Sequence, residues 1–170
     1  TEVEILHQYL DLDAAIQKES VLALNFFSAE SLQAHQKWWD QRQKDALKDS
    51  SELWERRHEF FQSIELCSEV ERQLRAIGVS KELSQIVDRL RTLDRYAAGW
   101  KEGDFSYKKV NATTNLRISP ESASTMRLFG SQRKFIVPGQ GKKSFELHIK
   151  TGNLRFHFYP ENTAKKIYVG

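Results

Sequence analysis

The chain has 170 residues, 39% of them hydrophobic and 11% aromatic, which is enough for a folded domain with a sizeable core. Its single cysteine excludes an internal disulfide framework and is typical of a cytoplasmic protein. No run approaches the roughly 18–20 apolar residues that span a bilayer, and no Gly-rich nucleotide-binding motif is present, so we expect neither membrane insertion nor a cofactor.

Charge is divided unevenly along the chain. Residues 1–100 carry 13 Lys and Arg against 18 Asp and Glu, whereas residues 101–170 carry 13 against 5. An acidic half joined to a basic half predicts that the second half binds an anion, for which nucleic acid is the usual candidate. The alternative is that the two halves attract each other.

The acidic half has helical patterns. Thr1 and Glu4 have the spacing of a capping box, so a first helix is expected to about residue 18. Residues 29–77 contain neither Gly nor Pro, and apolar side chains recur there every seven positions, at Leu32, Trp39, Ala46, Leu53, Phe60, Cys67 and Leu74. This stripe predicts one long helix or, as we favour, two antiparallel helices that break at residues 49–51, with Ser51 capping the second.

The same stripe is more apolar than a small bundle needs, so we expect it to dock onto a protein partner through Leu32, Trp39, Leu53 and Phe60. Cys67 has the spacing of a core residue rather than of a catalytic thiol. Gly78 is expected to end the stripe, and Ser80 to cap a further helix that runs to about Gly99.

The basic half has the signals of a small sheet. Short strands are expected within residues 105–118, and Ser119, Pro120 and Glu121 have the composition of a helix start, for a helix that ends by Gly130. Strands are then expected at residues 133–137, 145–150, 154–159 and 166–169. The last begins close to Gly170, and we expect residues beyond that position.

Two of these strands form a predicted hairpin. Apolar and polar residues alternate strictly along residues 145–150 and 154–159, and the connecting Gly152 and Asn153 tolerate the positive φ of a tight turn. If Gly152 and Asn153 are the central residues of the turn, His148 faces His157. If the turn is instead centred one residue earlier, on Thr151 and Gly152, His148 faces Arg155. Either register places one polar set on one face of the sheet: His148, Lys150, Arg155, His157 and Tyr159.

Three functions compete for this polar face. In the first it cleaves RNA without a metal, with His148 and His157 as acid and base, Arg155 and Lys150 holding the phosphate, and Tyr159 orienting it. In the second it only binds nucleic acid, RNA in preference to DNA, along a basic track. That track comprises Lys108, Lys109, Arg127, Arg133, Lys134, Lys142, Lys143, Lys150, Lys165 and Lys166. In the third it is a protein-binding surface. No metal is expected, because two histidines lack a Cys or carboxylate third ligand.

The runs at residues 145–150, 152–159 and 166–169 resemble the RelE/ParE toxin superfamily in their hairpin with a Gly-x-x-Arg motif and their following strand. The resemblance covers residues 120–170. It implies an antiparallel sheet on which Arg155 contacts an mRNA phosphate, assisted by basic residues of the preceding strand, Lys142, Lys143 and Lys150.

The sequence therefore predicts an α+β protein: a helical domain at residues 1–100, built as a bundle with long helices, and a small basic antiparallel sheet at residues 101–170. The predicted function is a RelE-like RNA-binding or RNA-cleaving module of a bacterial toxin–antitoxin or phage-defence complex. The alternative is a non-catalytic scaffold subunit that binds nucleic acid through its sheet and partners through its helices.

Overall fold

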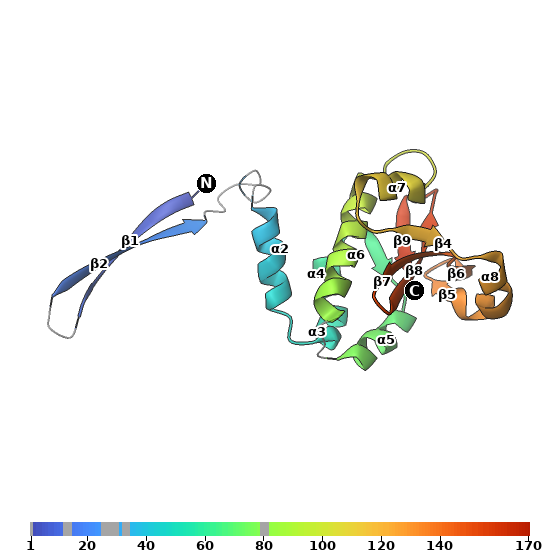
Figure 1. Ribbon diagram of the computed structural model, residues 1–170, viewed down its shortest axis with the longest axis horizontal. Helices are drawn as coiled ribbons and strands as arrows, with labels where there is room; N and C mark the ends of the chain where they lie inside the picture. Colours follow the sequence, from blue (N-terminus) through green and yellow to red (C-terminus); the bar gives the residue numbers. More distant parts are fainter. Residues whose placement is uncertain (1, 12–14, 25–30, 32–34, 79–81) are drawn as a thin grey trace. The chain divides into compact units, whose positions relative to one another are not determined.

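The computed structural model describes residues 2–11, 15–24, 31, 35–78 and 82–170 (Figure 1). It divides into two compact units, Thr1–Ala46 and Leu47–Gly170. The described residues form a mixed α/β protein with seven mostly short α-helices and nine strands. The expected N-terminal bundle of long helices is therefore wrong, and strands dominate the C-terminal half.

The first unit begins with a β-hairpin where a capped helix was expected. Strands β1 (Glu2–Leu10) and β2 (Ile16–Leu24) pair antiparallel, with Ile5 opposite Val21. Asp11 closes the turn: its amide donates to the Ala15 carbonyl at 3.0 Å, and its Oδ1 accepts from the Ala15 amide at 2.9 Å. Val3, Ile5, His7 and Tyr9 follow the period of two that a strand requires. Thr1 of the expected capping box lies outside the described residues.

The seven-residue stripe crosses several elements instead of following one or two helices. These are α2 (Gln36–Asp45), α3 (Ser50–Glu55), α4 (Arg57–Phe60), β3 (Ile64–Leu66) and α5 (Glu69–Ile77). A break near residue 49 does occur, but the cap is Asp49 rather than Ser51. The Asp49 side chain accepts a hydrogen bond from the Glu52 amide at 2.9 Å, which starts α3 at Ser50.

The longest helix of the second unit is the one the sequence predicted best. Gly78 follows α5 with φ of 60°, a conformation that suits glycine, and α6 (Glu82–Gly99) ends where expected. The expected cap of α6, Ser80, lies outside the described residues. The apolar face of α6 is buried as its spacing predicted, at Leu83, Ile86, Val87, Leu90, Leu93 and Ala97.

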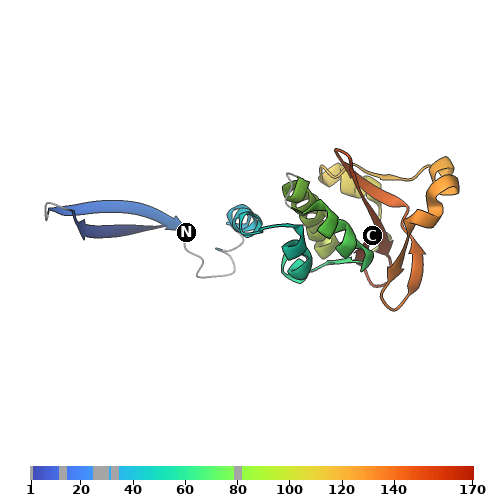
Figure 2. The ribbon, with the colours of Figure 1, turned by 90° about the horizontal axis from the view of Figure 1, so that it is seen from below.

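The second unit is organised around a five-stranded sheet with the order β3-β9-β8-β7-β4. In Figure 2 the green helix α6 lies to one side of the red strands of this sheet. Its other strands are β4 (Ile118–Pro120), β7 (Leu147–Thr151), β8 (Leu154–Glu161) and β9 (Lys166–Val169). β3 pairs parallel with β9, and the other pairs are antiparallel. Because β3 comes from the first hundred residues, the expected domain boundary at residues 100 and 101 falls inside this sheet unit.

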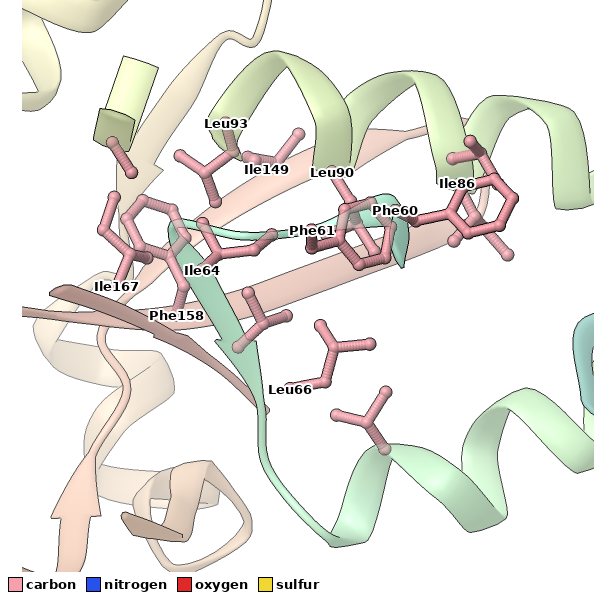
Figure 3. Packing of buried hydrophobic residues seen from close by; sticks show 14 of the residues in the cluster. Phe60, Phe61, Ile64, Leu66, Ile86, Leu90, Leu93, Ile149, Phe158 and Ile167 are labelled. Atoms are coloured by element: carbon pink, nitrogen blue, oxygen red, sulfur yellow. The ribbon is translucent and has the colours of Figure 1, made fainter. Parts of the chain in front are cut away.

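One hydrophobic core joins the helices to one face of this sheet. The sheet supplies Ile64, Leu66, Ile149, Phe158 and Ile167, and the helical side supplies Phe60, Phe61, Ile86, Leu90 and Leu93 (Figure 3). Leu53 and Phe60 belong to this core, with exposures of 0% and 5%. These two predicted docking residues are consequently buried by their own chain.

A smaller layer packs on the other face of the sheet. After α7 (Tyr107–Thr113) and β4, helix α8 (Ala123–Phe129) and the 3₁₀ turn η1 (Gly130–Arg133) lead into the hairpin of β5 (Lys134–Val137) and β6 (Gly141–Ser144). A second cluster of Cys67, Phe135, Val137, Phe145 and Tyr168 joins this hairpin to the sheet. Cys67 is buried, as its spacing predicted.

Two predictions in this segment are wrong. α7 occupies part of the region where short strands were expected, and Ser119 and Pro120 belong to strand β4 rather than to a helix start. The cap of α8 is Ser122, whose Oγ accepts from the Thr125 amide at 3.1 Å. In the part of the chain that the structure describes, no helix combines the length and apolarity needed to cross a bilayer.

Candidate functional site

The predicted hairpin is formed by β7 and β8 in the first of the two registers considered. His148 lies opposite His157, and Lys150 lies opposite Arg155. The two imidazole rings have centroids 5.6 Å apart. Gly152 occupies the turn with φ of 54°, which an L side chain adopts only with strain. The strand pairing therefore brings both predicted acid–base residues together.

Tyr159 has a packing role that the alternation did not predict. Strand β6 ends at Ser144 and β7 begins at Leu147, so Phe145 lies in a break between strands and does not share the face of Leu147. Its ring stacks against Tyr159, with centroids 5.8 Å apart, and belongs to the second hydrophobic cluster. The half-buried Tyr159 ring is thus part of the packing beneath the β5–β6 hairpin.

The two histidines are buried rather than displayed on an open face. His148 is 8% exposed and His157 is 6% exposed. Between them lies Glu121, whose Oε1 is 3.8 Å from Nδ1 of His148 and 3.8 Å from Nε2 of His157. Nε2 of His148 is 3.2 Å from the Ser119 hydroxyl. We name Glu121, His148 and His157 the histidine–glutamate cluster.

Sequence reasoning missed Glu121, because residues 119–121 were assigned to a helix start. The signal is in the pairing of β4 with β7, which sets Ser119 opposite His148. The Glu121 amide then donates to the Glu146 carbonyl at 2.8 Å and holds this residue beside the hairpin. Only the tertiary pairing of two segments far apart in sequence shows that the cluster has a carboxylate.

The surroundings of the cluster disfavour charged imidazoles. Burial and, after it, the nearby Arg133 guanidinium lower the pKa of His157 against the opposing effect of the Glu121 carboxylate, and the resulting pKa is about 4. Burial also lowers the pKa of His148, again against the effect of Glu121. Both shifts favour the neutral form of the imidazole.

A cleft of about 540 Å³ lies beside the cluster, and His157 forms part of its lining. Four cationic residues line it: Arg72 from α5, Arg133 from η1, Lys134 from β5 and Arg155 from β8. One acidic residue, Glu69, also lines it and accepts from the Ile136 amide at 3.2 Å. We name this the basic cleft.

The basic cleft contains some of the predicted site residues and one cation that was missed. Arg133, Lys134 and Arg155 were predicted from the basic half. Arg72 was not, because it belongs to the acidic half, and its position one helical turn from Glu69 gave no sign of a basic site. The parallel pairing of β3 with β9 brings the helix that follows β3 to the end of the sheet.

Other predicted basic residues lie outside this cleft. Lys142 and Lys143 are on β6, and Lys150 is exposed beside Arg155. The Lys165 ammonium donates to the Gly103 carbonyl at 2.6 Å and lies over the Trp100 ring, and Lys166 forms an ion pair with Glu65. Lys108 and Lys109 are on α7, and Arg127 is on α8.

The remaining predicted docking residues lie in the first unit. Trp39 on α2 is 41% exposed, and its ring is tilted against that of Trp38. Leu32 lies outside the described residues. Docking of a protein partner through the stripe therefore stays a prediction, and of its described residues Trp39 alone presents a large exposed side chain.

Comparison of the chain with protein-family models, with curated proteins and with solved structures returns no match. The resemblance to RelE/ParE toxins consequently stays a prediction, carried by the hairpin and the Gly-x-x-Arg motif.

Proposed function

We propose that this protein binds single-stranded RNA in the basic cleft, with Arg155 at a phosphate. The observation that supports the proposal is the convergence of four cationic side chains from α5, η1, β5 and β8 on one cleft with a single carboxylate. Lys and Arg that neutralise successive phosphates supply most of the affinity of a protein for nucleic acid.

The charges of the cleft are largely available to a ligand. Among the described residues of Leu47–Gly170, Arg72, Lys134 and Arg155 make no ion pair with an acidic side chain. Lys150 lies opposite Arg155 on the neighbouring strand, and its positive charge extends the basic surface beyond the cleft. Gln73, Gln132 and Asn153 add amide groups to the lining, and such groups hydrogen-bond both phosphates and bases.

The choice of RNA rests on the resemblance to RelE-like toxins, in which an arginine at the place of Arg155 contacts mRNA. A bacterial toxin–antitoxin or phage-defence complex is the setting that the resemblance implies. A non-catalytic scaffold subunit that binds nucleic acid would use the same cleft. RNA binding is therefore expected both for a RelE-like module and for a scaffold subunit.

We propose binding rather than cleavage by the histidine pair. A general acid must carry a proton at working pH, and with a pKa of about 4 His157 does not. Burial lowers the pKa of His148 as well, so both rings favour the neutral form, which is the wrong form to protonate a leaving oxygen.

The proposal is tested by fluorescence anisotropy of a labelled single-stranded RNA over a range of salt concentrations. Arg155→Ala and Arg72→Ala are expected to weaken binding and each to lower the slope of log affinity against log salt by about 0.7. Lys108→Ala, which removes an exposed cation of α7 outside the cleft, is the matched control and should bind like wild type.

Equal weakening by all three variants would mean that net charge, not the cleft, governs binding. Absence of RNA binding by wild type at low salt would refute the proposal, with single-stranded DNA as a parallel probe. Cleavage of the RNA in the presence of EDTA that is lost in His157→Ala would restore the catalytic interpretation.

A further inference from the structure

We propose that the histidine–glutamate cluster is a binding site for one divalent transition-metal ion of the zinc class. The ligands are Oε1 of Glu121, Nδ1 of His148 and Nε2 of His157. This inference rests on the geometry of the cluster and not on the proposed RNA binding.

The three side chains converge at a spacing that suits a metal better than it suits hydrogen bonds. Their ligand atoms all lie within 4.8 Å of one another, and Oε1 is 3.8 Å from each facing imidazole nitrogen. A hydrogen bond needs a separation of about 2.7–3.2 Å. Zinc bonds of about 2.0–2.2 Å in tetrahedral geometry require ligand atoms roughly 3.4 Å apart, so a small inward movement completes the site.

An unsatisfied nitrogen provides a second, independent observation. His148 is more than nine-tenths buried, and its Nδ1 makes no hydrogen bond although it faces Glu121. When Nε2–H donates to the Ser119 hydroxyl at 3.2 Å, Nδ1 presents a lone pair to the carboxylate. Two buried acceptors that face each other repel, and a cation between them removes the repulsion.

The surroundings resemble those of a protein metal ligand. The Ser119 hydroxyl contacts Nε2 of His148, the ring nitrogen that faces away from Glu121. A hydrogen bond to the non-ligating nitrogen commonly orients a histidine that binds a metal. His148 and His157 project from paired strands, and the Glu121 amide is anchored on Glu146. Two imidazoles and one carboxylate form a common three-ligand set for zinc that leaves a fourth position open.

Arg133 is the competing cation. Its Nε lies 3.4 Å from Oε1 of Glu121, and its charge acts on both histidines. The Arg133 side chain is 22% exposed and lines the basic cleft, so it has room to turn away from the carboxylate. Removing this charge should therefore tighten metal binding, whereas removing a ligand should weaken it.

The test uses the full chain, stripped with EDTA and desalted, and isothermal titration with zinc chloride in the absence of RNA. We expect one zinc ion per chain, at least tenfold weaker binding by Glu121→Gln, and tighter binding by Arg133→Gln. His58→Gln, which alters an exposed histidine on α4, is the matched control and should bind like wild type. At the same cobalt concentration, the visible absorption of a tetrahedral site should appear in wild type, Arg133→Gln and His58→Gln, and should be lost in Glu121→Gln.

No zinc binding by wild type, or equal affinity of wild type and Glu121→Gln, overturns the proposal. Loss of binding in His58→Gln would place the metal elsewhere and also overturns it. Circular dichroism checks that Glu121→Gln folds; where it does not, Arg133→Gln decides, because unchanged or weaker zinc binding in that variant contradicts a site at Glu121.

Discussion

The side-chain amide of Asn111 makes both main-chain hydrogen bonds of Ile118. Its Nδ2 donates to the Ile118 carbonyl at 2.8 Å, and its Oδ1 accepts from the Ile118 amide at 2.7 Å. Asn111 lies on α7, and Ile118 begins β4, the edge strand of the five-stranded sheet. One side chain therefore occupies the place of a neighbouring strand and satisfies an edge that would otherwise be open.

Replacing this side chain should destabilise the second unit measurably. Asn111→Ala leaves the amide and carbonyl of Ile118 without partners, so we expect the free energy of unfolding to fall by about 1–3 kcal/mol. Urea denaturation measures the change. Lys108→Ala on the same helix is the control and should stay within about 0.5 kcal/mol of wild type. Equal effects of the two variants would contradict a special role for the Asn111 amide.

Burial of His157 predicts a loss of stability in mild acid. Its pKa is about 4 in the folded chain against an ordinary value of 6.5, so between these values the unfolded chain takes up a proton that the folded chain does not. The free energy of unfolding should fall as the pH drops through this window, by up to roughly 2–3 kcal/mol in all. Arg133 and His148 act in the same direction, and Glu121 opposes them.

Urea denaturation in EDTA at several pH values from 7.5 to 5 measures the slope of the free energy of unfolding against pH in the absence of metal. His157→Asn, which cannot titrate, should lower the slope even where it also lowers the absolute stability. An unchanged slope in the variant would show that His157 does not cause the pH dependence.

Cys67 should be chemically inert in the folded protein. The thiol is 1% exposed, and burial, with help from the charges of Glu69 and Glu65, raises its pKa to about 12. Almost no thiolate is present at pH 8, and only the thiolate reacts readily. Ellman's reagent should therefore label the chain slowly in buffer and rapidly in guanidinium chloride. Fast labelling of the folded chain would be inconsistent with the packing of Cys67 beneath the β5–β6 hairpin.

The second unit should fold without the first. Residues 47–170 contain both hydrophobic clusters, so a chain limited to them retains the whole described core. We expect a cooperative thermal transition within a few degrees of that of the full chain, measured by circular dichroism. A non-cooperative melt would mean that the core needs residues 1–46.

Local patterns predicted the β7–β8 hairpin, the end of α5 at Gly78 and the apolar face of α6. In each case the deciding signal lies within a few residues: strict alternation around a Gly-Asn turn, one glycine with positive φ, or helical spacing. Such signals are read directly from neighbouring positions, and the structure confirms them except at Phe145, which precedes β7.

The seven-residue stripe misled the prediction for a physical reason. Leu53, Phe60 and Leu74 share a spacing, yet each belongs to a different helix, and all three pack into one core. Equal spacing arose because several short elements each turn one apolar side inwards. Periodicity alone does not distinguish this arrangement from one long helix.

The candidate site was predicted only in part, because its members meet through tertiary pairing. His148, His157 and Arg155 follow from the hairpin. Glu121 and Arg72 do not, since β4 must pair with β7 and β3 with β9 before these side chains approach the site. No local pattern near either residue contains that information.

The sheet order also constrains how the chain folds during synthesis. β9 lies between β3 and β8, so a strand close to residue 170 completes the middle of the sheet. Until it leaves the ribosome, β3 and β8 each keep an unpaired edge, and one side of the core lacks Ile167 and Val169. The nascent chain therefore cannot complete this sheet before β9 is synthesised, and during that interval it is most exposed to proteases and to pairing with other chains.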